Sequence, residues 1–150
     1  MDMQSIIDTV SGFDGALVVQ PRPGSEFPEL SWGDAYFYYA PDGTMPARTQ
    51  PYGTIITKNY PDDDASHLDA PDRFRVNVNA GRSLVEDLDA DQDPSQVDVL
   101  LPHPLYASSG WVSVVNPAEH TSEHLVSLLR RAHDAARART DRRSSLGDVS

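Results

Sequence analysis

Phe74-Arg75-Val76-Asn77-Val78-Asn79 is the stretch of the chain that most clearly indicates the fold. Apolar and polar side chains alternate along it, and a period of two places the two kinds on opposite faces of a β-strand. The apolar face is expected to pack on a core. The polar face, with Arg75, Asn77 and Asn79, is interpreted as the outer face of a sheet.

Further strands are predicted on both sides of this stretch. Residues that fit a pleated surface fill the segments 15–20, 32–39, 52–58 and 110–115. Turns containing Gly and Pro, such as Ala40-Pro41-Asp42-Gly43-Thr44, separate them. Because strands joined by short turns pair antiparallel, we expect a small antiparallel sheet.

Two helices are predicted before and between the strands. The first is expected to end at Gly12. Its apolar residues are spaced three and four apart, at Met3, Ile6, Ile7 and Val10. A second, short helix is indicated at residues 83–88, and an acidic loop follows at 89–98.

A long C-terminal helix is predicted after the last strand. One stripe of it keeps helical spacing and is expected to pack on the sheet: Leu125, Leu128, Leu129, Ala132, Ala135 and Ala136. Asn116 serves as its N-cap in our interpretation, because Pro and Glu follow at the spacing of a helix start, and Thr121 is the alternative. The apolar period stops at Thr140, so residues 141–150 are expected to form a flexible tail.

The expected fold class is therefore α+β, with an N-terminal helix and a long C-terminal helix packed on a small antiparallel sheet. Residues 1–140 form a single domain in this prediction, since 150 residues is an ordinary length for one core.

Composition excludes several classes of protein. The chain has no Cys, so disulfides, thiolate metal sites and cysteine nucleophiles are excluded. It shows no apolar stretch long enough for a transmembrane helix and no basic start typical of a signal peptide. We therefore expect a cytoplasmic protein without membrane contact.

The net charge of −11 is unevenly distributed. Residues 1–129 contain 20 acidic and 6 basic side chains, whereas residues 130–150 contain 6 Arg and 3 Asp. An acidic body repels phosphate backbones, because nucleic-acid affinity depends on cations that displace condensed counterions. We therefore do not expect a nucleic-acid partner.

Metal-binding patterns in the sequence are incomplete. Asp89-Ala90-Asp91-Gln92-Asp93 begins like a calcium loop, but the sixth and twelfth positions hold Pro and Leu instead of Gly and Glu. His120 and His124 share a helical face without a third ligand at a recognisable spacing. Asp62-Asp63-Asp64 is interpreted as an exposed acidic turn. We expect no metal and no other cofactor.

Signatures of catalysis are also missing. Ser108-Ser109-Gly110 lacks the Gly-x-Ser-x-Gly elbow that exposes a nucleophile, and no Gly-rich phosphate loop occurs. We assign no catalytic residue and favour a protein that is not an enzyme.

Two features favour ligand binding. In the aromatic run Tyr36-Phe37-Tyr38-Tyr39 two rings must face each side of a strand, so one pair is available to a second core or to a cleft. His103 lies between two prolines, which hold it in an extended segment. With their neighbours they give the candidate ligand-binding residues Trp32, Tyr38, Lys58, Arg75, Asn77, His103, Tyr106 and Trp111.

The sequence resembles an actinobacterial family, domain of unknown function six-one-nine-four. The resemblance rests on segments spread over nearly the whole chain: Ser31-Trp32-Gly33-Asp34, Tyr38-Tyr39-Ala40-Pro41-Asp42-Gly43, residues 50–58, Phe74-Arg75-Val76-Asn77, Leu101-Pro102-His103-Pro104 and Gly110-Trp111-Val112. This family implies no activity.

A looser resemblance connects the chain to the MmcQ/YjbR proteins, through an opening helix, a Trp-Gly before the first sheet strands, a Trp-containing late strand and a closing helix. It implies a CyaY-like α+β fold and, for some members, DNA binding. Ser109-Gly110 stands here where that family has Lys-Lys or Lys-His before the Trp.

These features are consistent with three functions. The leading hypothesis is a non-catalytic module that binds a small molecule or a protein, of undetermined oligomeric state. The alternatives are a DNA-binding regulator of MmcQ/YjbR type, which would use the arginines of the last helix, and a hydrolase-like enzyme that would use His103.

Overall fold

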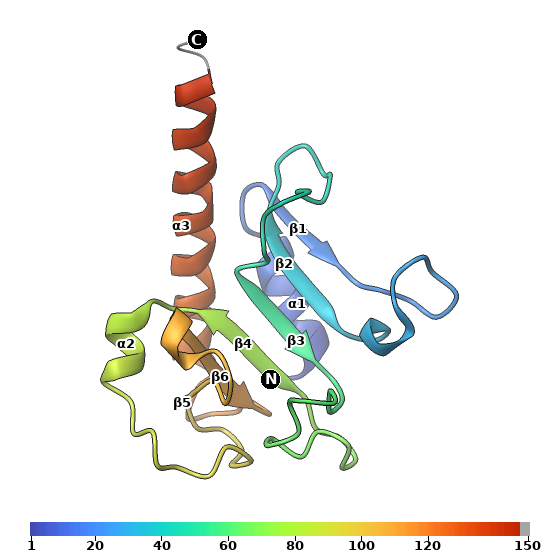
Figure 1. Ribbon diagram of the computed structural model, residues 1–150, viewed down its shortest axis with the longest axis vertical. Coiled ribbons are helices and arrows are strands. Elements are labelled where there is room, and N and C mark those ends of the chain that lie inside the picture. The colour runs from blue at the N-terminus through green and yellow to red at the C-terminus, as the bar shows by residue number, and fades with distance from the viewer. Residues whose placement is uncertain (148–150) are drawn as a thin grey trace.

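The computed structural model of the chain describes residues 1–147. Its centre is a six-stranded sheet in which every neighbouring pair is antiparallel, in the order β1-β2-β3-β4-β6-β5. Two of the helices, α1 and α3, cover one face of the sheet (Figure 1). The predicted α+β class with helices packed on an antiparallel sheet is confirmed.

Along the chain, a helix is followed by four strands, a short helix, two more strands and a long helix. Their bounds are α1 (Met3–Ser11), β1 (Ala16–Val19), β2 (Ala35–Tyr39), β3 (Gly53–Ile56), β4 (Arg75–Asn79), α2 (Arg82–Glu86), β5 (Leu101–Pro102), β6 (Trp111–Val115) and α3 (Ser122–Gly147). Two short 3-10 helices lie at Glu29–Ser31 and Ala107–Ser109. The two-residue strand β5 was not predicted, because Pro102 makes it too short to show a period.

The hydrophobic core lies between the sheet and the two helices. The apolar face of β4 contributes Val76 and Val78, both 0% exposed, as the alternation predicted. The stripe of α3 that was expected to pack on the sheet does so through Leu125, Leu128 and Leu129, of which none is more than 1% exposed. Burial of such side chains contributes roughly 1.5–3 kcal/mol each before conformational entropy is subtracted.

His133 fastens the middle of α3 to two distant segments. Its Nδ1 accepts the hydroxyl proton of Tyr52 at 2.9 Å, and its Nε2 donates to the carbonyl of Asp14 at 2.7 Å. The contact with Tyr52 is protected from water, since Tyr52 and His133 are each 3% exposed. These bonds fix where α3 crosses the sheet.

The start of α3 matches the alternative cap instead of the leading one. The helix begins at Ser122, directly after Thr121, whose carbonyl accepts the N–H of Leu125. Asn116 is therefore not its N-cap, and the Oδ1 of Asn116 accepts the backbone N–H of Phe74. The carboxylate of Asp98 accepts the N–H groups of Ala118, His120 and Thr121 and the hydroxyl of Thr121. A distant side chain therefore satisfies the donors that precede the helix, which spacing along the sequence could not show.

The end of α3 also differs. The helix continues seven residues beyond the predicted end at Thr140, to Gly147, and projects past the sheet (Figure 1). Residues 141–147 contain no Pro, and Arg142, Arg143 and Leu146 are good helix formers, so the helix can continue without an apolar stripe. The last part of the predicted tail, residues 148–150, lies outside the described residues.

Candidate functional site

A cavity of about 560 Å³ lies on the sheet face opposite the two helices. Its floor contains a row of side chains from neighbouring strands, because the registers place Tyr36 beside Thr54 and Thr54 beside Asn77. Arg75 and Trp111 belong to the same face at other positions along β4 and β6. The floor is thus built from every second residue of adjacent strands, as the pleat requires.

Three loops form the walls of the cavity. The β2–β3 connection contributes Gln50 and Pro51, and the segment around β5 and the second 3-10 helix contributes His103, Tyr106 and Ser109. The third wall is the covering segment, which we define as residues 57–70, with Tyr60, Asp62 and Asp63. A concave site of this volume, lined by aromatic rings and a few polar groups, is typical of small-molecule binding.

The covering segment is fastened to the sheet by Asp34. This carboxylate, 1% exposed, accepts the N–H and hydroxyl of Thr57, the ammonium of Lys58 and the hydroxyl of Tyr60. Burial and the bond to Asp34 raise the pKa of Tyr60, so its phenol stays protonated and continues to donate. Asp34 therefore fixes one side of the cavity.

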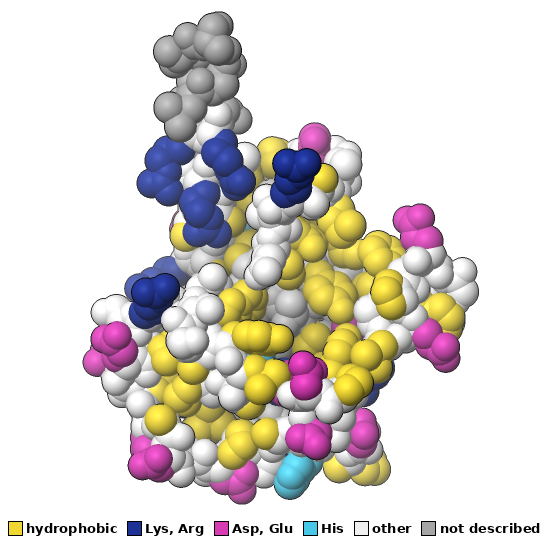
Figure 2. Space-filling model, in the orientation of Figure 1, with side chains coloured by type: hydrophobic (Ala, Val, Ile, Leu, Met, Phe, Trp, Pro, Cys, Tyr) yellow, Lys and Arg dark blue, Asp and Glu magenta, His cyan; other side chains and the backbone are white. Residues whose placement is uncertain are grey.

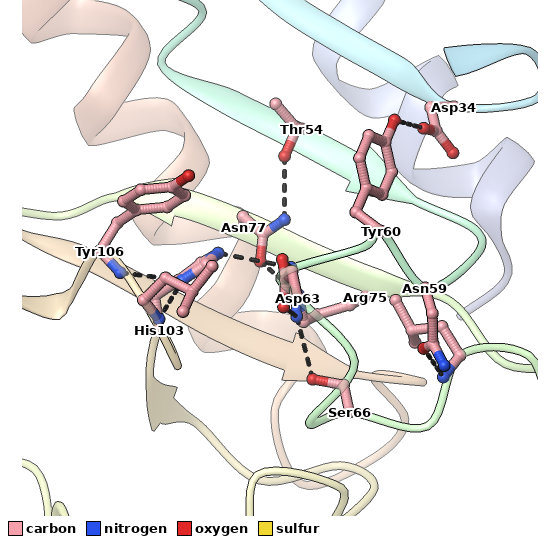
Figure 3. A network of polar contacts seen from close by, with 12 residues as sticks. Asp34, Thr54, Asn59, Tyr60, Asp63, Ser66, Arg75, Asn77, His103 and Tyr106 are labelled. Atoms are coloured by element: carbon pink, nitrogen blue, oxygen red, sulfur yellow. Dashed lines mark hydrogen bonds and ion pairs between the residues drawn. The ribbon is translucent and has the colours of Figure 1, made fainter. Parts of the chain in front are cut away.

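Arg75 fastens the other side of the covering segment (Figure 3). Its guanidinium, 1% exposed, donates to both carboxylate oxygens of Asp63 at 2.9 and 2.5 Å and to the hydroxyl of Ser66 at 3.0 Å. Its Nε donates to Asn77, whose amide donates in turn to Thr54. The positive charge is therefore neutralised within the protein.

His103 is held in one tautomer by its own loop. Its Nδ1 accepts the backbone N–H groups of Leu105 at 3.0 Å and Tyr106 at 3.1 Å. Burial, followed by the charge of Arg75, lowers the pKa of His103 to about 4, although Asp63 opposes this shift. The ring is therefore neutral at pH 7, with its proton on Nε2.

The Nε2–H of His103 meets another donor instead of an acceptor. The atom 3.4 Å away is Nη2 of Arg75, a guanidinium nitrogen that can donate a hydrogen bond but cannot accept one. Within the described residues no oxygen accepts from this Nε2, although His103 is only 5% exposed. Two buried N–H groups thus converge in the cavity wall, and an unpaired buried donor costs about 1–3 kcal/mol.

The structure brings five of the eight candidate residues together. They line the cavity: Arg75, Asn77, His103, Tyr106 and Trp111. The other three are elsewhere: the indole of Trp32 donates to the carbonyl of Phe27, Lys58 pairs with Asp34, and Tyr38 is 8% exposed but outside the cavity. Sequence reasoning grouped these three by residue type, which does not give their position around the sheet.

Two interpretations of exposure are wrong. Arg75 and Asn77, expected on an outer sheet face, are 1% and 3% exposed, because the covering segment lies over them. In the expected exposed turn Asp62-Asp63-Asp64, the outer two residues are exposed, but the side chain of Asp63 is only 12% exposed and pairs with Arg75. Asn79 is exposed, as expected for that face.

Sequence reasoning missed several residues of the site. Tyr36 and Thr54 could have been found, because the alternation of their strands places them on the cavity face. Asp34, Tyr60, Asp63 and Ser66 carried no local signal of this kind, since they lie in turns and loops.

The geometry limits the chemistry of the site. Neither ring nitrogen of His103 contacts a hydroxyl or a carboxylate within hydrogen-bonding distance among the described residues. With Nδ1 occupied and Nε2 protonated, the ring can donate a hydrogen bond but is not poised as a general base.

In residues 1–147 no group of three or more His, Asp and Glu side chains is placed to hold a metal ion. None of the described helices has the length and apolarity that crossing a membrane requires.

Comparison with known proteins gives one match. The family described as "Family of unknown function (DUF6194)" matches residues 1–145. No curated protein and no solved structure matches the chain.

Proposed function

Because the chain belongs to the DUF6194 family, which has no known function, we propose from the site itself that this protein binds a small molecule without transforming it. The bound group is an oxygen acceptor such as a carbonyl, which accepts from both the Nε2–H of His103 and an Nη2–H of Arg75 on the cavity side of the pair. The observation that carries the proposal is the pair of convergent N–H groups at 3.4 Å in a buried wall of the cavity.

The rest of the cavity supports a flat ligand. The rings of Tyr36, Tyr60, Tyr106 and Trp111 all line it. Tyr106 is 52% exposed at the rim and lies beside the imidazole of His103, with ring centroids 4.9 Å apart. Such rings bind aromatic and other planar groups by offset or edge contacts.

The charge of the cavity supports a neutral ring system. Arg75 is the one Lys or Arg among the described lining residues, and Asp63 already pairs with it. Asp62 adds a negative charge at the wall. An anion placed at this depth would therefore meet no uncompensated positive charge.

The test is a screen of neutral aromatic amides and ketones, followed by titration of each compound that raises the melting temperature. The key variant is His103→Asn, because the asparagine oxygen can replace Nδ1 as acceptor for the two backbone N–H groups while the Nε2–H is lost. We expect at least about a tenfold loss of affinity, equal to about 1.4 kcal/mol.

Tyr38→Phe is the matched control, since Tyr38 lies on the same sheet face outside the cavity. It should bind like the wild type. Unchanged affinity in His103→Asn, or a screen in which no compound binds, would overturn the proposal.

DNA binding remains the second candidate, supported by the resemblance to the MmcQ/YjbR proteins and by the arginines of α3. Three of those arginines, Arg139, Arg142 and Arg143, line a second hollow next to the cavity.

A further inference from the structure

A second hollow, of about 640 Å³, lies beside the cavity and beneath the projecting part of α3. Four arginines line it, which we call the arginine cluster: Arg48, Arg139, Arg142 and Arg143. The other lining residues are uncharged: Thr49, Gln50, Pro51, Tyr52, Asn79 and Trp111. The lining therefore contains four positive charges and no negative one.

This concentration of positive charge is unusual for the chain. The whole sequence has 12 Lys and Arg and a net charge of −11, yet a third of those basic residues line one hollow. Figure 2 shows Lys and Arg side chains gathered on α3, whereas Asp and Glu are spread around the rest of the visible face.

The members of the cluster are positioned to act together. Arg139, Arg142 and Arg143 are three and four residues apart, so they share one side of α3, and Arg48 adds a fourth from the β2–β3 connection. Among the described residues none of the four forms an ion pair, although Arg137 of the same helix pairs with Asp14 and Asp141. No carboxylate among residues 1–147 therefore forms an ion pair that relieves their mutual repulsion.

The two hollows lie next to each other and share part of their lining. Gln50, Pro51 and Trp111 line both of them, so a ligand in the cavity can extend over Trp111 toward the arginine cluster without leaving the protein surface. The charges of the two parts differ. The cavity holds a neutralised arginine and an exposed Asp62, and the second hollow holds arginines that pair with no described carboxylate.

We infer that the ligand is bipartite, with a neutral planar ring in the cavity and an anionic phosphate group on the arginine cluster. This inference rests on the proposed function, since it needs the ring to occupy the cavity. Arginine guanidinium groups bind phosphate by paired N–H contacts, and several of them can share one dianion.

The experiment compares matched pairs of compounds that differ by one phosphate: adenosine and AMP, uridine and UMP, riboflavin and FMN. Binding is followed by tryptophan fluorescence and isothermal titration. We expect the phosphorylated member of at least one pair to bind ten times more tightly than its parent or better, and the advantage to fall as salt is raised.

The key variant is the triple change Arg139→Ala, Arg142→Ala and Arg143→Ala. It should remove the advantage of the phosphate and leave the affinity of the unphosphorylated parent unchanged. The control triple Arg22→Ala, Arg82→Ala and Arg131→Ala alters exposed arginines outside both hollows and changes the net charge equally, so it should preserve the advantage.

The failures of the two proposals are distinguishable. One outcome is that His103→Asn weakens binding of the unphosphorylated compounds, while the phosphorylated compounds bind no more tightly than their parents. This outcome would overturn the inference of a bipartite ligand and support the proposed function. Equal losses in both triple variants would also overturn the inference, because total charge would then explain the effect.

Binding of duplex DNA is measured as the last comparison. DNA that binds through the arginine cluster and is not displaced by the phosphorylated compound would overturn the inference in favour of a nucleic-acid surface. AMP, UMP or FMN that binds regardless of His103→Asn would overturn both proposals, since the cavity would not be used.

Discussion

Arg75 is a buried cation whose position depends on one loop carboxylate. Burial of a guanidinium is costly unless its charge is paired and its N–H groups are bonded, and Asp63 supplies the charge. Burial raises the pKa of Asp63, but the bonds and charge of Arg75 lower it further, below the ordinary 3.8. The pair therefore stays ionised at neutral pH and holds the covering segment against the sheet.

Replacing Asp63 by Ala should destabilise the protein by about 3–5 kcal/mol, because a buried guanidinium is left without its partner. Urea unfolding at pH 7 measures the change. Asp62→Ala is the matched control, as the neighbouring carboxylate is exposed, and should cost less than about 0.5 kcal/mol.

The double variant Arg75→Met with Asp63→Leu removes both charges and should recover much of the lost free energy of unfolding. If Asp63→Ala unfolds within about 1 kcal/mol of the wild type, the ion pair does not hold the covering segment.

At the scale of elements, α3 depends on a residue outside its own sequence. Asp98 accepts four hydrogen bonds from residues 118–121, just before the helix. Desolvation raises the pKa of Asp98, but the bonds from Thr121 and from the N–H groups of Ala118 and His120 lower it to about 2. The ionised form is therefore favoured by folding.

Asp98→Ala should cost about 1–2 kcal/mol at pH 7, the range of a lost helix cap. The stabilisation by Asp98 is complete above its ordinary pKa of 3.8 and is lost as the pH falls through about 2. The difference in unfolding free energy between wild type and variant should therefore shrink over this range. A difference that stays constant from pH 7 to pH 2 would contradict this role of the carboxylate.

For the whole molecule, α3 consists of a part that packs and a part that projects. Its core residues end at Ala136, although the helix runs to Gly147. The full helix is about 39 Å long at 1.5 Å per residue, and its residues 137–143 add no buried apolar side chain to the core. The projecting part adds charge and surface instead of buried apolar area.

Removing residues 141–150 should therefore leave the melting temperature within about 2 °C of the full chain. The shortened protein should keep the affinity for a neutral ring compound and lose that part of the phosphate affinity which depends on Arg142 and Arg143. Thermal denaturation followed by circular dichroism checks the first expectation. A fall of more than about 5 °C would show that the projecting part stabilises the fold.

Local patterns in the sequence were enough to predict most elements and the fold class. The alternation in residues 74–79 located β4, and the spacing of Leu125, Leu128 and Leu129 located α3, because a strand and a helix impose their own periods on any buried face. The uneven charge of the chain is likewise a property of the sequence alone.

The tertiary structure alone decided what covers the polar face of the sheet. Alternation shows that Arg75 and Asn77 share a face, but it does not show whether water or another segment lies over that face. The chain returns through residues 57–70 and pairs Asp63 with Arg75, 12 residues apart, and its later loop brings His103 within 3.4 Å of the same guanidinium. A contact between a loop and a strand depends on the path of the whole backbone and leaves no period in the sequence, so only the tertiary structure shows the site.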